Sequence, residues 1–219
     1  MKKPSYDLRR CSRDDVIPLI EQFHPYGSAG KLCVYAFAVF ERGRPVAGYL
    51  WQPPPPGAAT SVCIEAPQGV LALSRMVATP RDERELNHVS KPLRRQMRAL
   101  IDRGRWPVLV TYSDETLGHT GHVYKCAGWE RCERRPFKFY EDGRGRRVSA
   151  YSAGRMRDVS GMRSGSGFIQ RWEHWACERG EADQHMLSNG WAREPTGRKW
   201  KSGRPAYRWV NNPQMELFG

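Results

Sequence analysis

One stretch decides the fold of this 219-residue chain: LSRMVATP (73–80), LNHVSKPLRRQ (86–96) and VLVTYSDETLGHTGHVYKCAGW (108–129). Its patterning has the order strand, helix, strand, helix. Two strands joined by a helical crossover pair in parallel, and ligands commonly bind at the carboxyl ends of such strands. The stretch therefore predicts an α/β fold with a central parallel strand pair. Functional residues are expected near Arg75, Asn87 and Asp114.

The residues before this stretch predict a first strand followed by a capped helix. Residues 5–10 form a candidate first strand, and Ser12 with Asp15 makes a capping-box pattern ahead of the apolar residues that follow. That helix is expected to end near His24 and Pro25, because proline interrupts a helix. The chain thus enters the sheet from a short capped helix.

The next residues predict an antiparallel start to the sheet. The apolar run LCVYAFAVF (32–40) and the segment VAGYLW (46–51) flank a Gly-Arg-Pro turn and predict a hairpin. PPPPGAAT (53–60) predicts an extended surface loop, because proline cannot donate a ladder hydrogen bond. A third strand is predicted from Val70 to Ala78.

The residues after Trp129 predict a smaller, basic part. FKFYEDGRGRRVSAYSA (137–153) has the pattern of two strands around a turn, and GMRSGSG (161–167) that of a flexible link. FIQRWEHWACERG (168–180) predicts a helix whose aromatic stripe packs in the core. A late strand at about 206–210 is expected to complete the sheet. We therefore divide the chain into a core at 1–152 and a basic extension at 153–219 with a flexible tail.

Charge favours a polyanionic partner. The chain has 36 Lys plus Arg against 23 Asp plus Glu, a formal net charge of +13 and a pI near 9.8. Arginine interleaved with tryptophan and tyrosine suits phosphates and bases, although a merely basic protein is the alternative. The candidate nucleic-acid contacts from two basic segments are Arg144, Arg146, Arg147, Lys199, Trp200 and Lys201.

Cysteine usage and hydropathy point to a protein of the cytoplasm. The six cysteines form no CxxC pair and no regular zinc spacing, so reduced thiols are expected. The longest apolar stretch, 32–40, is too short to span a bilayer, so no membrane partner is expected.

Four segments together resemble a known family. YKCAGW (124–129) has a tyrosine and a Gly-aromatic pair at the end of a short helix, as in the GNAT acetyltransferase superfamily. With LSRMV (73–77), YSDETLGHTG (112–121) and GRPAYRWV (203–210), the chain resembles the Mom family of phage DNA-modification enzymes. That family attaches a carbamoylmethyl group to the N6 amine of adenine, which protects the DNA from host restriction. The resemblance covers roughly residues 20–210, most strongly 71–129.

The resemblance implies a GNAT-like fold and an activated acyl donor such as acetyl-CoA. It gives Tyr124 the role of protonating the departing thiolate and makes Gly128 the helix stop. Coenzyme A usually binds at a glycine-rich turn, but the turn after the third strand contains no glycine between Ala78 and Leu93. Asn87 or Ser90 could leave amides free for an anion or serve only as caps. Met76 and Val77 are further candidate cofactor contacts.

Asp114 is the first candidate for the chemistry on adenine. It lies just past a buried strand, where it could hold the amine and take a proton; its alternative role is an Asx turn or a helix cap. Arg75, inside a strand, could bind a carboxylate, a phosphate or a base edge, or pair with Asp114. Ser113 is a weaker catalytic candidate.

The segment HPYGS (24–28) supplies candidates for base and metal binding. Adenine must leave the stack to react, and Tyr26, Tyr112 or Trp51 could stack on the extruded base. The resemblance also implies iron as a possible cofactor, with His24 and Asp114 as the candidate ligands. His119 and His122, three residues apart, could serve too.

The chain ends with QMELFG (214–219), which resembles the peptide by which bacterial replication proteins bind the sliding clamp. Gln214, Met215, Leu217 and Phe218 match that peptide, while an apolar tail packed on the domain is the alternative. Two other functions stay open for the whole chain. One is N-acetyl transfer to a small amine or a protein lysine; the other is DNA binding without catalysis on the same scaffold.

Overall fold

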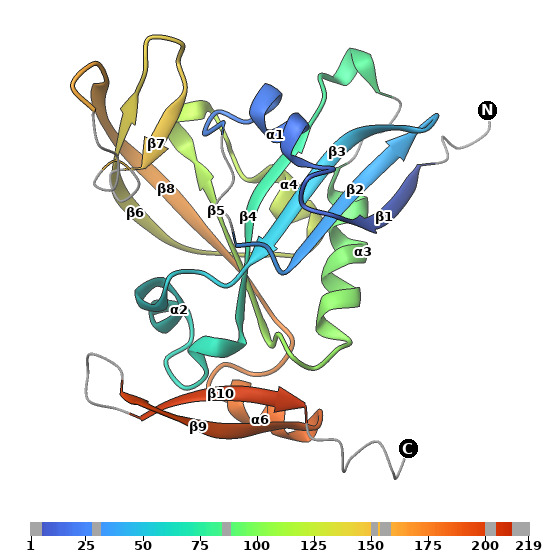
Figure 1. The fold of residues 1–219 in the computed structure, drawn as a ribbon, viewed down its shortest axis with the longest axis vertical. Helices are drawn as coiled ribbons and strands as arrows, with labels where there is room; N and C mark the ends of the chain where they lie inside the picture. Colours follow the sequence, from blue (N-terminus) through green and yellow to red (C-terminus); the bar gives the residue numbers. More distant parts are fainter. Residues whose placement is uncertain are drawn as a thin grey trace. The chain divides into compact units, whose positions relative to one another are not determined.

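The structure is a computed structural model that describes residues 6–27, 32–84, 89–149, 153, 159–199 and 205–211. Figure 1 shows the arrangement of the secondary structure elements. In chain order they are β1 (Asp7–Cys11), α1 (Ile17–Phe23), β2 (Tyr35–Glu41), β3 (Arg44–Gln52), α2 (Pro56–Val62), η1 (Pro67–Gly69), β4 (Val70–Ala78), η2 (Arg81–Glu83), α3 (Ser90–Ile101), β5 (Val108–Asp114), η3 (Glu115–Leu117), α4 (His122–Ala127), β6 (Glu130–Glu141), β7 (Arg147–Ser149), β8 (Arg163–Trp175), α6 (Ala182–Ser188), β9 (Trp191–Lys199) and β10 (Pro205–Asn211).

A mixed sheet organises the chain. It is 8-stranded, in the order β1-β2-β3-β4-β5-β8-β6-β7. Strands β1 to β4 pair antiparallel with their neighbours, and so do β6, β7 and β8. Within the described strands, the central pair β4–β5 is parallel, and α3 forms the crossover between the two strands. This pair confirms the predicted α/β architecture.

The decisive stretch folds as predicted. β4 occupies Val70–Ala78, and α3 begins at Ser90 with Pro92 in its first turn, where the missing proline N–H costs nothing. α4 ends at Gly128, whose φ of 90° lies in the left-handed region that favours glycine. β4 and β5 are neighbours at the middle of the sheet, and they diverge toward their carboxyl ends (Figure 1).

One face of the sheet is covered by α1. The predicted capping box is present: the Ser12 N–H and hydroxyl donate to Asp15, and the Asp15 N–H donates to the Ser12 hydroxyl. The apolar side of α1 packs on β2, β3 and β4. The members of that core cluster are Val16, Leu19, Ile20, Ala36, Ala38, Leu50 and Val77.

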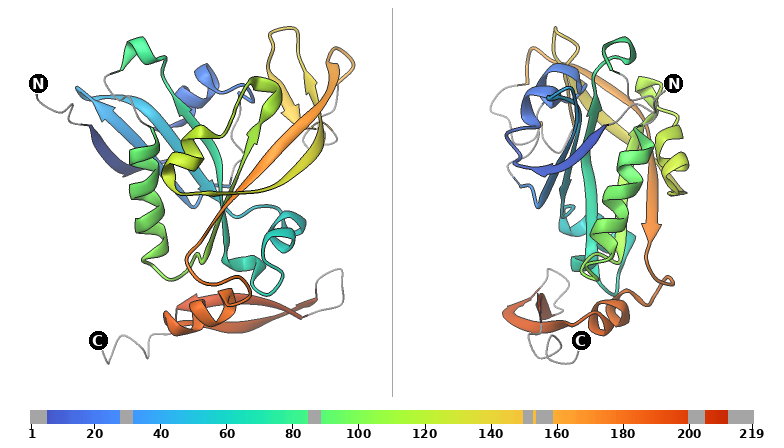
Figure 2. Two further views of the ribbon diagram at one scale, coloured as in Figure 1. Left: turned by 180° about the vertical axis from the view of Figure 1, so that it is seen from behind. Right: turned by 90° about the vertical axis from the view of Figure 1, so that its right-hand side faces the viewer.

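The opposite face carries α3 and α4 (Figure 2, right). There the rings of Trp51 and Trp129 stack with centroids 6.3 Å apart, and Tyr124 meets Trp129 edge-on at 5.9 Å. Trp51 is fully buried in this cluster. It therefore packs in the core, which argues against its use as a stacking platform for a base.

The prediction of an extended loop at 53–60 is wrong for its second half. Pro56 begins helix α2, and Pro55 is the residue that caps it. A proline suits this place because the first helical N–H groups have no partner within the helix. The run of prolines therefore precedes and starts a helix rather than excluding one.

The helix predicted at 168–180 is also wrong. Residues 163–175 form β8, which lies between β5 and β6, and the glycine-rich link is its first half. The aromatic stripe fitted helical spacing, but sheet pairing to β6 overrides that preference. The late strand exists as β10, but it pairs with β9 in a separate two-stranded sheet and does not complete the large one.

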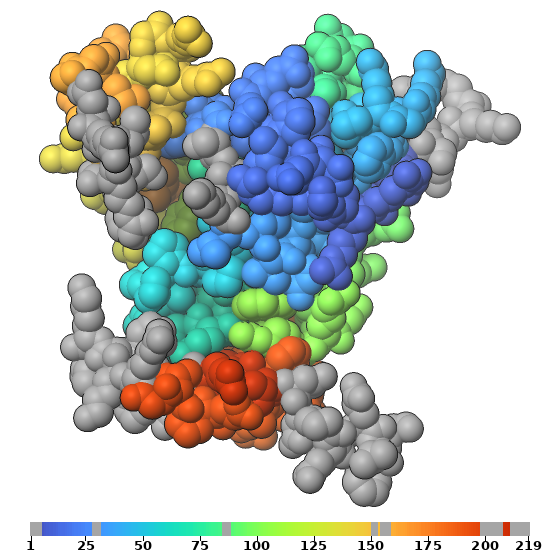
Figure 3. Space-filling model, in the orientation of Figure 1, coloured from blue at the N-terminus to red at the C-terminus, as the bar shows by residue number. Residues whose placement is uncertain are grey.

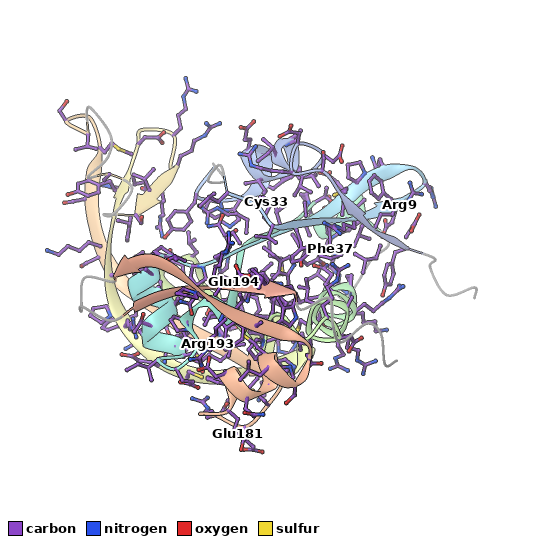
Figure 4. All side chains as sticks on the ribbon, turned by 60° about the horizontal axis from the view of Figure 1, so that its bottom comes forward. Arg9, Cys33, Phe37, Glu181, Arg193 and Glu194 are labelled. Atoms are coloured by element: carbon purple, nitrogen blue, oxygen red, sulfur yellow. The ribbon has the colours of Figure 1, made fainter. Side chains whose placement is uncertain are left out.

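The chain divides into two compact units. The first contains Met1–Gln52, Ala72–Arg95 and Val110–Glu173; the second contains Pro53–Leu71, Gln96–Leu109 and His174–Gly219. In the second unit Arg193 on β9 pairs with Asp183 of α6, and the neighbouring Glu194 pairs with Arg208 on β10. Figure 4 labels Arg193 and Glu194. None of the helices in the described part of the chain is long and apolar enough to cross a membrane.

Candidate active site at the end of strand β5

Asp114 is the centre of the candidate site. It is the last residue of β5, its side chain is buried, and both of its carboxylate oxygens accept hydrogen bonds. Oδ1 accepts from the Thr116 backbone N–H (2.9 Å) and hydroxyl (2.6 Å), and Oδ2 accepts from the Tyr26 hydroxyl (2.8 Å). Asp114 therefore caps η3, which is the alternative role predicted for it. It also binds Tyr26, which lies 88 positions earlier in the chain.

Tyr26 reaches Asp114 from the loop after α1. A tight turn forms where the Gly27 N–H donates to the His24 carbonyl at 2.8 Å. The Arg147 N–H on β7 donates to the Pro25 carbonyl at 3.0 Å, which ties the loop to the far edge of the sheet. Burial and the hydrogen bond to Asp114 raise the pKa of the Tyr26 phenol, so the phenol keeps its proton at neutral pH.

Arg75 and His24 flank Tyr26. The Arg75 guanidinium lies over the Tyr26 ring, 5.7 Å from its centroid, and donates to the Ser74 carbonyl at 2.7 Å. Burial lowers the pKa of Arg75 and, together with the Arg75 and His119 charges, lowers the pKa of His24 to about 3. His24 is therefore neutral at physiological pH, and its Nδ1 accepts the Tyr26 N–H at 3.1 Å.

Arg147 closes the site from β7. It donates to the Thr116 hydroxyl at 2.5 Å, lies 3.4 Å from Asp114 Oδ2, and donates to Glu141 at 2.9 Å. Its guanidinium also lies over the Phe139 ring at 4.2 Å. Hydrogen bonds from Arg147 and Arg163 lower the pKa of Glu141. In Figure 3 the surface is hollowed between the yellow segment around β7 and the blue segment of α1.

Ser113 and Tyr124 lie on the other side of β5, since successive strand residues face opposite ways. The Ser113 hydroxyl accepts from the Trp172 indole N–H at 3.0 Å, and Ser113 is buried. Tyr124 is buried as well and hydrogen-bonds Thr111; burial raises the pKa of its phenol. The structure thus brings Asp114, Tyr26 and Arg75 together and separates Ser113 and Tyr124 from them.

Tyr112 shares the Asp114 face of β5 but has different neighbours. Its phenol is half-buried near Arg171, Arg135, Glu173 and Glu133, and burial raises its pKa. Tyr112 therefore lies within a cluster of charged residues of β6 and β8. It is two residues before Asp114 and so faces the same side of β5.

The candidate cofactor contacts are spread along β4 and α3. Val77 is buried against α1, so only its backbone could meet a ligand, while Met76 is half-buried. Asn87 lies outside the described residues. Ser90 is the first residue of α3, a helix that continues with exposed Lys91 and Arg95, and the unpaired amides of a first turn favour an anion. These residues fit a coenzyme that carries phosphates.

The residues present do not fit an iron site of three protein ligands. Among the described residues no group of three or more His, Cys, Asp or Glu side chains could hold a metal. The Nδ1 of His24 and both Asp114 oxygens are already engaged as acceptors. His24 and Asp114 are linked through Tyr26 instead.

The basic candidates have unequal surroundings. The backbone N–H groups of Arg144 and Arg146 donate to Asp142 in the turn between β6 and β7, and both residues are exposed. Arg147 belongs to the Asp114 site. Of the second basic segment, Lys199 ends β9 and its side chain lies outside the described part, as do Trp200 and Lys201. The four clamp-peptide residues, Gln214, Met215, Leu217 and Phe218, also lie outside it.

Three residues of the site were not predicted. Thr116 follows Asp114 by two, and the Asx-turn pattern could have indicated it. Glu141 binds Arg147, and Trp172 binds Ser113 on the other side of β5; both come from strands far along the chain, and no local pattern indicates such pairings. Trp172 in particular was assigned to a helix that does not form.

Comparisons with known proteins give a family and a fold. The model of the Mom protein family matches residues 5–173. The ribosomal-protein-S18-alanine N-acetyltransferase of Escherichia coli is similar in structure, with a TM-score of 0.52 at 12% identity over 81% of this chain and 97% of that one. A probable acetyltransferase of Staphylococcus epidermidis gives 0.50 at 10% identity over 79% and 100%. The search of curated proteins found no match. The fold is therefore that of the GNAT-like acetyltransferases.

Proposed function

This chain belongs to the Mom protein family, and from that premise we propose that it attaches a carbamoylmethyl group to the N6 amine of adenine in DNA. Such a product would protect the DNA from host restriction. The observation that carries the proposal is the buried Asp114 carboxylate at the carboxyl end of β5, held against Tyr26 at 2.8 Å beside a parallel strand pair. That is where ligands bind in sheets of this kind.

The chemistry of adenine explains the need for such a group. The N6 lone pair is delocalised into the ring, so the amine must lose a proton as it attacks. Both Asp114 oxygens already hold donors, which favours Tyr26 as the residue that meets the amine. Its oxygen would take the amine proton while its own proton passes to Asp114. The adenine would reach this place only after extrusion from the duplex.

The activated acyl donor would bind at β4 and the start of α3. Acetyl-CoA, when bound, would supply an activated two-carbon group and a thiolate leaving group. The first-turn amides of α3 and Lys91 would hold its phosphates. Tyr124 is buried on the other side of β5 and hydrogen-bonded to Thr111. The departing thiolate would therefore instead receive the proton that the Tyr26–Asp114 relay takes from the amine.

Attack of the amine on the thioester carbonyl with loss of thiolate would by itself give N6-acetyladenine. The carbamoylmethyl group is joined to N6 through its CH2 carbon and ends in an amide, so its formation from an acetyl group also requires an amide nitrogen donor and a two-electron oxidant that forms the N6–CH2 bond.

Mass spectrometry of nucleosides tests the proposal. DNA from bacterial cells that express the chain should contain N6-carbamoylmethyladenine. Asp114→Asn keeps the side-chain size but removes the charge and one acceptor, so the adduct should fall about 100-fold or more while DNA binding is retained. Asp102→Asn, at an exposed position after α3, is the matched control and should leave the adduct unchanged.

The outcomes separate the three functions. Folded wild-type protein that leaves adenine unmodified overturns the proposal. If that protein binds acetyl-CoA but not DNA, transfer to a small amine or a lysine takes its place; if it binds DNA but no donor, it acts without catalysis. Equal adduct levels with Asp114→Asn would remove Asp114 from the mechanism.

A further inference from the structure

The first half of β8 contains two glycines that lie against the candidate site. Gly165 and Gly167 belong to the SGSG segment and pair with Phe139 and Phe137 on β6. A methyl group on Gly167 would lie 2.0 Å from Cγ2 of Thr116, far inside van der Waals contact. The other neighbours of that methyl group, Thr116 Cβ at 3.5 Å and Phe137 at 3.6 Å, are at ordinary contact distance.

Thr116 cannot give way without losing its hydrogen bonds. Its hydroxyl donates to Asp114 Oδ1 at 2.6 Å and accepts from Arg147 at 2.5 Å. A threonine side chain moves between staggered rotamers, so turning Cγ2 away from Gly167 also turns the hydroxyl away from both partners. The space above Gly167 therefore allows Thr116 to keep the rotamer in which its hydroxyl binds both Asp114 and Arg147.

Gly165 lies against Phe139, which also supports Arg147, in the way that Gly167 lies against Thr116. A methyl group at position 165 would lie 2.4 Å from the Phe139 ring, and that ring carries the Arg147 guanidinium at 4.2 Å. The two glycines are alternate residues on β8 and so face the same side. Both therefore leave room for groups that hold Arg147 and Asp114.

We infer that Gly167 is a positioning residue for the reaction: the absence of a side chain there keeps Thr116 in the rotamer that orients the Asp114 carboxylate toward Tyr26. The predicted loss of adduct formation in Gly167→Ala rests on the proposed function. The geometric basis of the inference does not depend on that function.

A second-site rescue tests the inference. Gly167→Ala should lower adduct formation per folded molecule about 100-fold, because displacement of a catalytic group by about 1 Å costs that much. Thr116→Ser removes the clashing methyl group and keeps the hydroxyl, so Gly167→Ala with Thr116→Ser should recover most of the activity. Thr116→Ser alone is the reference for the double variant, whose activity should equal that of Thr116→Ser and exceed that of Gly167→Ala. Gly161→Ala, where a methyl group meets nothing within 4 Å, is the control.

A readout that needs no activity separates this inference from the proposed function. In protein labelled with 13C-tyrosine, the ring Cζ signal of Tyr26, assigned by its loss in Tyr26→Phe, reports the hydrogen bond to Asp114. Gly167→Ala should shift that signal, the double variant should restore it, and Gly161→Ala should leave it in place. An unmoved signal or undiminished adduct in folded Gly167→Ala overturns the inference, as does a double variant that stays as impaired as Gly167→Ala. Wild-type protein without adduct overturns the proposed function alone.

Discussion

Asp114 illustrates what single residues reveal at this site. Its position after a buried strand predicted it as a functional candidate, and the structure places it, buried, as the last residue of β5. The donors to Oδ1 come from Thr116 and are local, but the sequence could not indicate that Oδ2 is occupied, because its donors come from Tyr26, 88 positions away, and from Arg147. A side chain's type and neighbours in sequence predict its chemistry, whereas its partners depend on long-range packing.

His24 gives a prediction at the same scale. In the unfolded chain a histidine binds a proton near pH 6.5, but His24 in the folded protein does so only near pH 3. Between these pH values the unfolded state binds more protons, so the free energy of unfolding should fall as the pH is lowered from 6.5 toward 3. The contribution is at most about 1.4 kcal/mol per pH unit.

Urea unfolding at several pH values measures this effect. His24→Asn retains an oxygen that can accept the Tyr26 N–H and removes the titration, so its stability should depend less on pH over this range. His122→Asn, at an exposed position on α4, is the control and should keep the wild-type slope. Identical slopes for His24→Asn and wild type would contradict the depressed pKa.

At the scale of elements, β4, β5, α3 and the capping box were predictable because each has a strong local signal. β8 was not. In FIQRWEHW the apolar and polar residues fit both a helical stripe and strand alternation, and the preceding glycines imitate a flexible link. Those glycines are required by close packing against Thr116 and Phe139, a cause that acts between elements and leaves no local pattern.

The Ser12–Asp15 box, which closes the turn before α1, gives a prediction for an element. Asp15 accepts two hydrogen bonds from Ser12, at 2.8 Å each, and α1 covers one face of the sheet. Asp15→Ala should therefore lower the free energy of unfolding by about 1 kcal/mol. Asp14→Ala removes an exposed ion pair with Arg13 and should change it little. Equal losses for the two variants in chemical denaturation would show that the cap is unimportant.

At the scale of the whole molecule, the net charge of +13 predicts electrostatic association with DNA. Each neutralised phosphate releases counterions, so DNA affinity should fall steeply with salt, by about 1000-fold between 50 and 200 mM if six or more phosphates are contacted. A fluorescence anisotropy titration measures this. Affinity that does not change with salt would exclude a backbone-dominated interface.

Arg144 and Arg147 should differ in that experiment. Arg144 is exposed in a turn, whereas Arg147 is committed to Glu141, Thr116 and Asp114. Arg144→Ala should therefore reduce the logarithmic salt slope by about one. Arg147→Ala should leave the slope nearly unchanged and abolish the adduct. A reversed assignment would mean that the basic turn does not contact phosphates.

The position of β8 in the sheet has a consequence for biosynthesis. β8 lies between β5 and β6, so the nascent chain must emerge past residue 173 before β5 gains its neighbour and Trp172 can reach Ser113, 59 positions earlier. Until then the strand that carries Asp114 has an open edge, which invites pairing with other chains. A ribosome that stalls before Arg163 would release a chain prone to aggregation, and the candidate site would be complete only late in translation.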